Sequence, residues 1–190
     1  DIRVYSLIED NDDYLWLGTL HGLYKYKDST ITSLREIDER LGSRINDMVV
    51  FKDDLLVGTG SVGLFFIRDD TIRYQLNKNN LLPSDVVREI CIYDDSTLWL
   101  AMNNGLVRMV VDGTDSLTFK TDWISIDDGL PTPEIHDIKA IGGYIWLATD
   151  IGLVSFEEED IRPSNIPPLL KISDIQADGI SSPLMDSVVL

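Results

Sequence analysis

Cysteine and histidine are scarce in this sequence of 190 residues, which has one cysteine and two histidines. The single thiol, Cys91, excludes a disulfide within the chain, and its place in an alternating apolar run indicates a small buried side chain. Two histidines without a cysteine cluster do not supply the ligands of a zinc site. No apolar run approaches the roughly 20 residues that a membrane-spanning helix requires. The sequence therefore predicts no metal site, no cofactor and no membrane segment.

Basic residues are also few. Sixteen lysine and arginine residues are set against 33 aspartate and glutamate residues, so the formal net charge is −17. Such a surface repels phosphate backbones and anionic lipid headgroups, which argues against nucleic-acid binding and electrostatic docking to membranes. Since 44% of the residues are hydrophobic, the chain still has enough apolar side chains for a folded core.

Catalytic motifs are missing as well. The sequence has no phosphoacceptor histidine followed by a helix, no glycine-rich nucleotide loop and no Gly-x-Ser-x-Gly nucleophile elbow. The acidic stretch 10–13 lacks the glycine and the terminal glutamate of a calcium-binding loop, and the stretch 157–160 is interpreted as an exposed turn. We therefore expect the chain to have no catalytic activity.

A pattern of about 40 residues is repeated four times along the chain. It consists of an alternating apolar run, a short polar turn, a core of the type Leu-Trp-Leu-Gly-Thr and then a Gly-Leu pair. The cores are 15–19, 55–59, 98–102 and 145–149, and the Gly-Leu pairs are 22–23, 63–64, 105–106 and 152–153. Because these features recur in one order, the chain is a tandem array of one structural unit.

Each unit predicts four short antiparallel strands, which is the size and pattern of one β-propeller blade. The predicted fold class is all-β, with four blades at about 1–41, 42–83, 84–132 and 133–163. The Trp or Leu at the second core position is expected to fill the space between adjacent blades, and the glycine after the core to supply a positive φ. Residues 164–190 are expected to be a proline-rich linker and the opening strands of a second, truncated β domain.

These motifs resemble the two-component regulator propeller repeat, in which an I-x-D strand, L-W-I-G-T, G-L and an aromatic strand follow one another. The matching residues are Glu9-Asp10, 15–19 and 22–26, and the connectors 81–85 and 128–131 are similar to the G-L-P-S linker of that family. Pro167-Pro168 and the strand after it resemble the start of the triple-tyrosine Ig-like module. The chain departs from the pattern at Leu56, Ala101-Met102 and Ala148, and sensors of the family carry more than four blades.

The resemblance implies the C-terminal part of the periplasmic sensor of a Bacteroides-type hybrid two-component histidine kinase, anchored in the inner membrane. Ligands in that family are commonly polysaccharide breakdown products, so the resemblance implies a non-catalytic domain that senses an oligosaccharide and signals across the membrane. Two alternatives remain open at this stage. One is a protein-interaction scaffold, and the other is a polysaccharide-degrading propeller enzyme.

The connectivity of a blade indicates where a ligand would bind. The turns between the second and third strands lie at the same end as the connectors between blades, and these loops are the more varied set, so we expect recognition at this end. Their polar side chains could hydrogen-bond to sugar hydroxyls or pair with a uronic carboxylate. The candidate binding residues are His21, Arg44, Ser61, Asn103, Asn104, His136 and Asp150.

A row of four blades leaves two blade faces and their strand edges uncovered. Exposed apolar faces and unpaired edges favour association. The isolated chain is therefore expected to self-associate.

Overall fold

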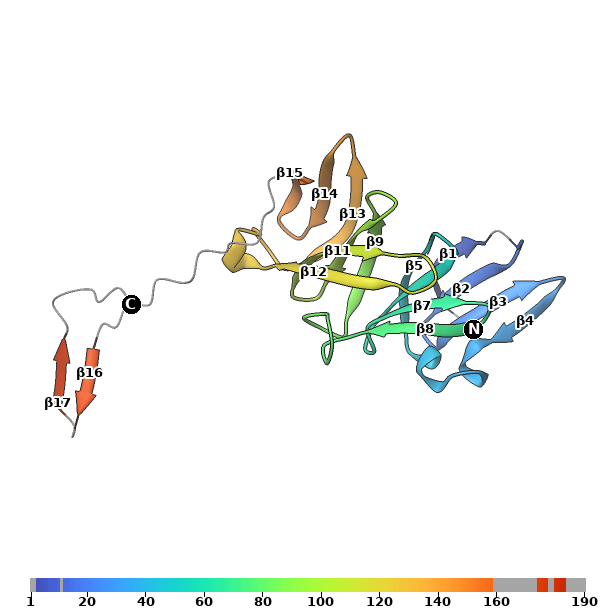
Figure 1. The fold of residues 1–190 in the computed structure, drawn as a ribbon, viewed down its shortest axis with the longest axis horizontal. Coiled ribbons are helices and arrows are strands. Elements are labelled where there is room, and N and C mark those ends of the chain that lie inside the picture. The colour runs from blue at the N-terminus through green and yellow to red at the C-terminus, as the bar shows by residue number, and fades with distance from the viewer. Residues whose placement is uncertain (1–2, 11, 159–173, 178–179, 184–190) are drawn as a thin grey trace.

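The structure, a computed structural model, describes residues 3–10, 12–158, 174–177 and 180–183 (Figure 1). Its described part consists of β-strands with three short 3₁₀ helices, η1 (Leu34–Glu36), η2 (Glu39–Gly42) and η3 (Ile126–Asp128), in the connectors. The all-β fold class predicted from the sequence is confirmed.

The strands between residues 4 and 157 form four antiparallel sheets, each built from consecutive strands. The first sheet contains β1 (Val4–Glu9), β2 (Leu15–Thr19), β3 (Gly22–Lys27) and β4 (Thr30–Ser33). The second contains β5 (Ile45–Phe51), β6 (Asp54–Thr59), β7 (Leu64–Arg68) and β8 (Thr71–Leu76). The third contains β9 (Val87–Ile92), β10 (Thr97–Met102), β11 (Gly105–Asp112) and β12 (Thr118–Ile124). The fourth contains β13 (Ile135–Ile141), β14 (Tyr144–Thr149) and β15 (Gly152–Glu157). We call these sheets blades 1 to 4.

The fourth strand expected for blade 4 would follow β15 and lies outside the described residues. Most of the segment 164–190 also lies outside them. Within it, β16 (Asp174–Ala177) and β17 (Ile180–Pro183) pair as a separate antiparallel hairpin. The blade boundaries, the linker and the Ig-like module stay predictions.

The first strands of the four blades lie next to one another. β1 packs against β5, β5 against β9, and β9 against β13, so the first strands of successive blades lie side by side (Figure 1). This is the arrangement of propeller blades around a central channel.

The hydrophobic core lies between blades. One cluster of buried side chains joins blades 1 and 2, a second joins blades 2 and 3, and a third joins blades 3 and 4. The second core position contributes Trp16, Leu56 and Trp99, one to each cluster, so its predicted role between blades is confirmed. Trp146 of blade 4, which has no following blade among the described residues, is only partly buried.

The glycine after the core makes the turn into the third strand possible. Gly63 has a φ of 90°, and a Cβ there would lie 2.0 Å from the Leu76 carbonyl oxygen of the neighbouring strand. A side chain would therefore be excluded both by the backbone conformation and by the close approach of β8.

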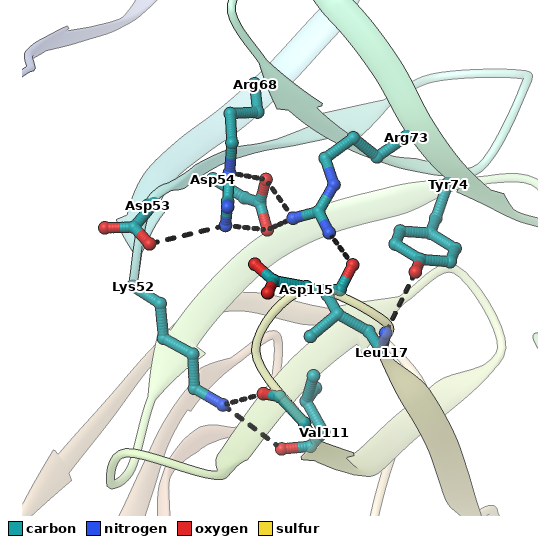
Figure 2. Close-up of polar contacts among 10 residues, drawn as sticks. Lys52, Asp53, Asp54, Arg68, Arg73, Tyr74, Val111, Asp115 and Leu117 are labelled. Carbon is teal, nitrogen blue, oxygen red and sulfur yellow. Dashed lines mark hydrogen bonds and ion pairs between the residues drawn. The ribbon is translucent and has the colours of Figure 1, made fainter.

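Polar contacts also hold blade 2 against blade 3 (Figure 2). Asp54, which is 2% exposed, accepts hydrogen bonds from Arg68 and Arg73, and Arg73 also donates to the Asp115 carbonyl oxygen of blade 3. On the same side, Lys52 Nζ lies 3.2 Å from the Gly113 carbonyl oxygen and the Tyr74 hydroxyl accepts from the Leu117 amide at 2.9 Å. Charge-assisted hydrogen bonds of this kind fix the position of one blade relative to the next.

A pocket formed by one bulge from each blade

The first strand of every blade contains a β-bulge at the same place. In blade 1, Val4 pairs with Thr19 and Ser6 with Gly18, so Tyr5 has no partner in the ladder. The same interruption recurs in the other three blades, where the unpaired residues are Asn46, Arg88 and His136. A bulge turns its extra residue out of the alternating pattern and redirects its side chain. The four blades therefore present one redirected side chain each.

All four bulge residues line one pocket, beside the starts of the four first strands. The pocket has a volume of about 460 Å³, within the range of roughly 300–1,000 Å³ typical of small-molecule sites. Its other lining residues belong to the starts of the first strands or to the loops beside them. They are Arg44, Gly60, Val86, Glu89 and Ile135. We call this the channel pocket.

The two arginines of the channel pocket differ in their partners. Arg88 is ion-paired with Glu134, with 2.7 Å between its guanidinium nitrogen and the carboxylate oxygen. The Arg44 guanidinium lies 4.4 Å from the centre of the Tyr5 ring, and within the described part of the chain it has no acidic partner. An arginine stacked on an aromatic ring keeps its N–H groups available at the ring edge.

Two bulge residues also tie their blade to the next one. Asn46 donates a 2.7 Å hydrogen bond to the Val87 carbonyl oxygen, and Arg88 lies 3.5 Å from the Ile135 carbonyl oxygen. Val87 and Ile135 are the first residues of β9 and β13, so the two contacts are equivalent. The pocket lining is therefore also part of the interface between blades.

Three carboxylates follow the bulges, at Asp47, Glu89 and Asp137. Asp47 accepts hydrogen bonds from the Ser6 hydroxyl of blade 1 at 3.3 Å and from the Ile90 amide of blade 3 at 2.9 Å. Burial raises the pKa of Asp47 in spite of these bonds. Burial, together with repulsion by Asp47 and Asp137, raises the pKa of Glu89 to about 7. Glu89 therefore changes its charge near neutral pH.

Asp137 is neutralised by a neighbour on its own strand, since its carboxylate lies 3.2 Å from Lys139 Nζ. Within the described ranges, no group of histidine, cysteine, aspartate and glutamate side chains is arranged to hold a metal ion. Cys91 is buried among apolar neighbours, as predicted, and its burial raises the pKa of the thiol.

Hydrogen bonds confirm that the loops chosen from the sequence share one end of the blades. Ser61, in a turn of blade 2, lies 2.8 Å from the Ser43 hydroxyl of the preceding connector. Asp150, in the turn of blade 4, accepts a 2.7 Å hydrogen bond from Thr132 of the preceding connector. A backbone hydrogen bond also joins a turn of blade 2 to the preceding connector, since the Gly60 amide donates to the Arg44 carbonyl oxygen at 2.8 Å.

The channel pocket brings together two of the seven predicted binding residues, Arg44 and His136. The other five lie elsewhere in these loops. Ser61 and Asp150 form the hydrogen bonds to the preceding connectors just described. The side-chain nitrogen of Asn104 lies 3.4 Å from the Pro83 carbonyl oxygen. The Asn104 side-chain oxygen is buried without a partner in the described structure. His21 and Asn103 are exposed and do not line the pocket.

Sequence reasoning missed Tyr5, Asn46, Arg88 and Glu89, which lie in strands rather than in loops. One signal was available in the sequence. In each first strand two residues, rather than one, separate the first aliphatic residue from the next, as in Ile45-Asn46-Asp47-Met48 and Ile135-His136-Asp137-Ile138, and this breaks the alternation. Two successive residues facing the same space are the mark of a bulge.

The fold and the pocket define a β-propeller domain, and comparison with known proteins agrees. The family model described as "Two component regulator propeller" matches residues 1–21, which include β1 and β2. Residues 1–21 therefore match one two-component regulator propeller repeat, as the resemblance predicted for this part of the sequence.

Relatives extend the comparison over most of the chain. A histidine kinase, P4 of Formosa agariphila, is 25% identical over 96% of this chain, and the chain spans 14% of that protein's length. The extracellular domain of BT4673 from B. thetaiotaomicron superposes with a TM-score of 0.68 at 23% identity, covering 83% of this chain and 20% of that one.

The extracellular domain of the hybrid two component system BT3049, from the same organism, has a TM-score of 0.61 at 18% identity and covers 83% of this chain and 23% of that one. At these identities the structural likenesses show the fold. Among the helices that the structure describes, none is long and apolar enough to cross a membrane.

Proposed function

We propose that this chain is the ligand-binding part of an extracytoplasmic sensor domain of a two-component histidine kinase, and that it binds an oligosaccharide in the channel pocket. The convergence of four bulge residues, one from each blade, on a single pocket carries the proposal. Since loops and bulges on a rigid scaffold are where recognition residues concentrate, this pocket is the natural binding site.

The chemistry of the lining suits a sugar. The ring of Tyr5 offers an apolar face, and the guanidinium, amide and imidazole groups of Arg44, Asn46 and His136 offer hydrogen-bonding partners for hydroxyl groups. No enzymatic role is proposed for the chain; the phosphotransfer chemistry would belong to the parent kinase.

The pocket also connects ligand binding to the packing of the blades. Asn46 and Arg88 contact both the pocket and the following blade. A ligand that binds one arrangement of these residues more tightly than another would shift the packing between blades, and this shift is the signal that would pass toward the membrane.

Calorimetric titration of the 190-residue chain with a panel of oligosaccharides tests the proposal. The two histidines provide matched variants, because His136 lines the pocket and His21 is exposed outside it. We expect His136→Ala to weaken binding at least tenfold and His21→Ala to change it less than twofold. Absence of binding to every member of the panel, or equal losses in both variants, would contradict the proposal.

One observation favours a second candidate function, that of a protein-interaction scaffold. Ile141 and Leu153 of blade 4 are 63% and 71% exposed, and with Trp146 they line a second, apolar hollow of about 270 Å³. Stable association with a protein in the absence of any glycan, abolished by charged residues in this hollow, would favour the scaffold.

A further inference from the structure

We propose that the channel pocket recognises a sugar unit that carries a carboxylate, a uronic acid, and that Arg44 pairs with this carboxylate. The inference rests on the proposed function and adds the chemical class of the ligand. It is carried by the position, at the edge of a polar pocket, of an arginine that has no acidic partner among the described residues.

The surroundings of Arg44 explain why an anion would bind there. Its guanidinium is stacked on Tyr5 at 4.4 Å from the ring centre, and within the described ranges it makes neither an ion pair nor a side-chain hydrogen bond. The planar guanidinium presents two parallel N–H groups, which match the two oxygens of a carboxylate. Stacking on the ring also restricts the side chain before the ligand arrives, so less conformational entropy is lost on binding.

Most of the other charged groups in or beside the pocket already have partners. Arg88 is paired with Glu134, and Asp137 with Lys139. Asp47 is held by hydrogen bonds from two neighbouring blades. These pairs leave Arg44 as the cation of the lining that is available to a ligand. Glu89, which lines the pocket from blade 3, has a pKa raised to about 7, so near neutral pH it carries only part of a negative charge and repels an anion less than an ordinary carboxylate would.

Two further polar side chains complete the site around the rest of the sugar ring. The amide oxygen of Asn46 is available as an acceptor, because its nitrogen donates to Val87. His136, on blade 4, is exposed and has no hydrogen-bond partner for its side chain in the described structure. A uronic acid has hydroxyl groups beside its carboxylate, so it would contact residues from several blades at once.

The experiment compares acidic and neutral sugars that differ in one group. The 190-residue chain is titrated with disaccharides of galacturonic, glucuronic and mannuronic acid, with their neutral hexose counterparts, and with a disaccharide carrying a sulfate ester. Arg44→Gln removes the charge in the pocket. Arg35→Gln removes an equal charge from an exposed arginine outside it and serves as the control.

We expect at least one uronic acid disaccharide to bind at least tenfold more tightly than its neutral counterpart. Arg44→Gln should abolish this preference, and Arg35→Gln should leave it unchanged within twofold. Circular dichroism verifies that both variants are folded.

Three outcomes would overturn the inference. Equal binding of neutral and acidic sugars, or acidic-sugar binding that Arg44→Gln does not change, leaves the proposed function intact and removes the role of Arg44. Binding of the sulfated sugar alone replaces the uronic acid by a sulfate ester. If no sugar of either kind binds, the proposed function fails together with the inference.

Discussion

The Glu89 carboxyl is a half-buried acid at the contact of three blades. Burial and the Asp47 and Asp137 carboxylates raise its pKa from the ordinary 4.5 to about 7. Because the folded state binds the proton more tightly than the unfolded state does, ionisation of Glu89 lowers the stability of the fold as the pH rises from about 4.5 through 7. Ionisation of this residue next to the pocket therefore makes the stability of the domain depend on pH.

A Glu89→Gln substitution should remove this pH dependence. At pH 8 we expect the variant to be more stable than the parent chain by on the order of 1 kcal/mol, a modest value because Glu89 keeps contact with solvent. This corresponds to a rise of about 2–4 °C in the thermal midpoint of a chain of this size. At pH 5, where Glu89 is protonated, the two midpoints should coincide. Thermal unfolding followed by circular dichroism at both pH values measures the difference, and a constant gap would show that Glu89 is not its source.

At the scale of elements, the cluster around Asp54 joins strands of blade 2 to one another and to blade 3 (Figure 2). Asp54 begins β6, Arg68 ends β7 and Arg73 lies in β8. The side chain of Asp54 is 3% exposed, whereas that of the adjacent Asp53, which lies 3.5 Å from Arg68, is 79% exposed. The two neighbours thus have the same charge and very different surroundings.

We expect Asp54→Asn to lower the free energy of unfolding by about 2–4 kcal/mol, because two arginines lose the buried charge that they share. The matched control, Asp53→Asn, should change it by less than about 0.5 kcal/mol, since an exposed ion pair contributes little. Urea denaturation measures both values. Similar effects from the two substitutions would mean that burial does not determine the strength of this cluster.

The elements themselves could be predicted from the sequence, because each is specified locally. Alternating apolar residues predict the strands, and the positive φ of Gly63 is required by the turn that its repeat position predicts. The second core position could be placed between blades for a similar reason. Trp16 and Trp99 recur inside a strand, where a large apolar side chain must be covered.

The pocket could be predicted only in part, since it depends on how four distant strands come together. Arg44 was found because it lies in the connector before β5, and His136, although it lies in β13, was found because the connector predicted from the sequence was extended as far as this residue. Tyr5 and Arg88 were missed because a bulge decides which way their side chains point, and a bulge is set by pairing with another strand rather than by local sequence. For Ser61 and Asp150 the loop assignment was correct, but their polar groups bind the neighbouring connectors.

At the scale of the whole molecule, the described blades form a row with two uncovered faces. On blade 1, Leu7 and Ile31 are both 58% exposed, and on blade 4 Ile141 and Leu153 are exposed more strongly still. Between the blades, equivalent apolar positions are buried in the three core clusters. The two end faces thus have the character of an interface without a neighbour.

We predict that the 190-residue chain self-associates at micromolar concentration through these faces. Its mass by light scattering should rise with concentration above that of a single chain. Ile141→Lys combined with Leu153→Lys should shift this rise to at least tenfold higher concentration, because the charges would have to be buried.

Ile126→Lys provides the control for this prediction, since Ile126 is 59% exposed in η3, away from the apolar hollow of blade 4. It should leave the association unchanged. A chain that stays monomeric over the whole concentration range would show that the end faces are stable in water.

The repeated bulge has a consequence for how such domains diversify. Tyr5, Asn46, Arg88 and His136 each lie at a break in the regular pairing of their strand, and their side chains differ between blades while the position of the break is the same. Each blade therefore has one residue position at which a mutation can alter the chemistry of the pocket while the register of the strands stays the same. Duplication of a blade adds one such position, so a lineage of such domains can reach new ligands with few mutations, most freely where the side chain, like those of Tyr5 and His136, makes no hydrogen bond to the next blade among the described residues.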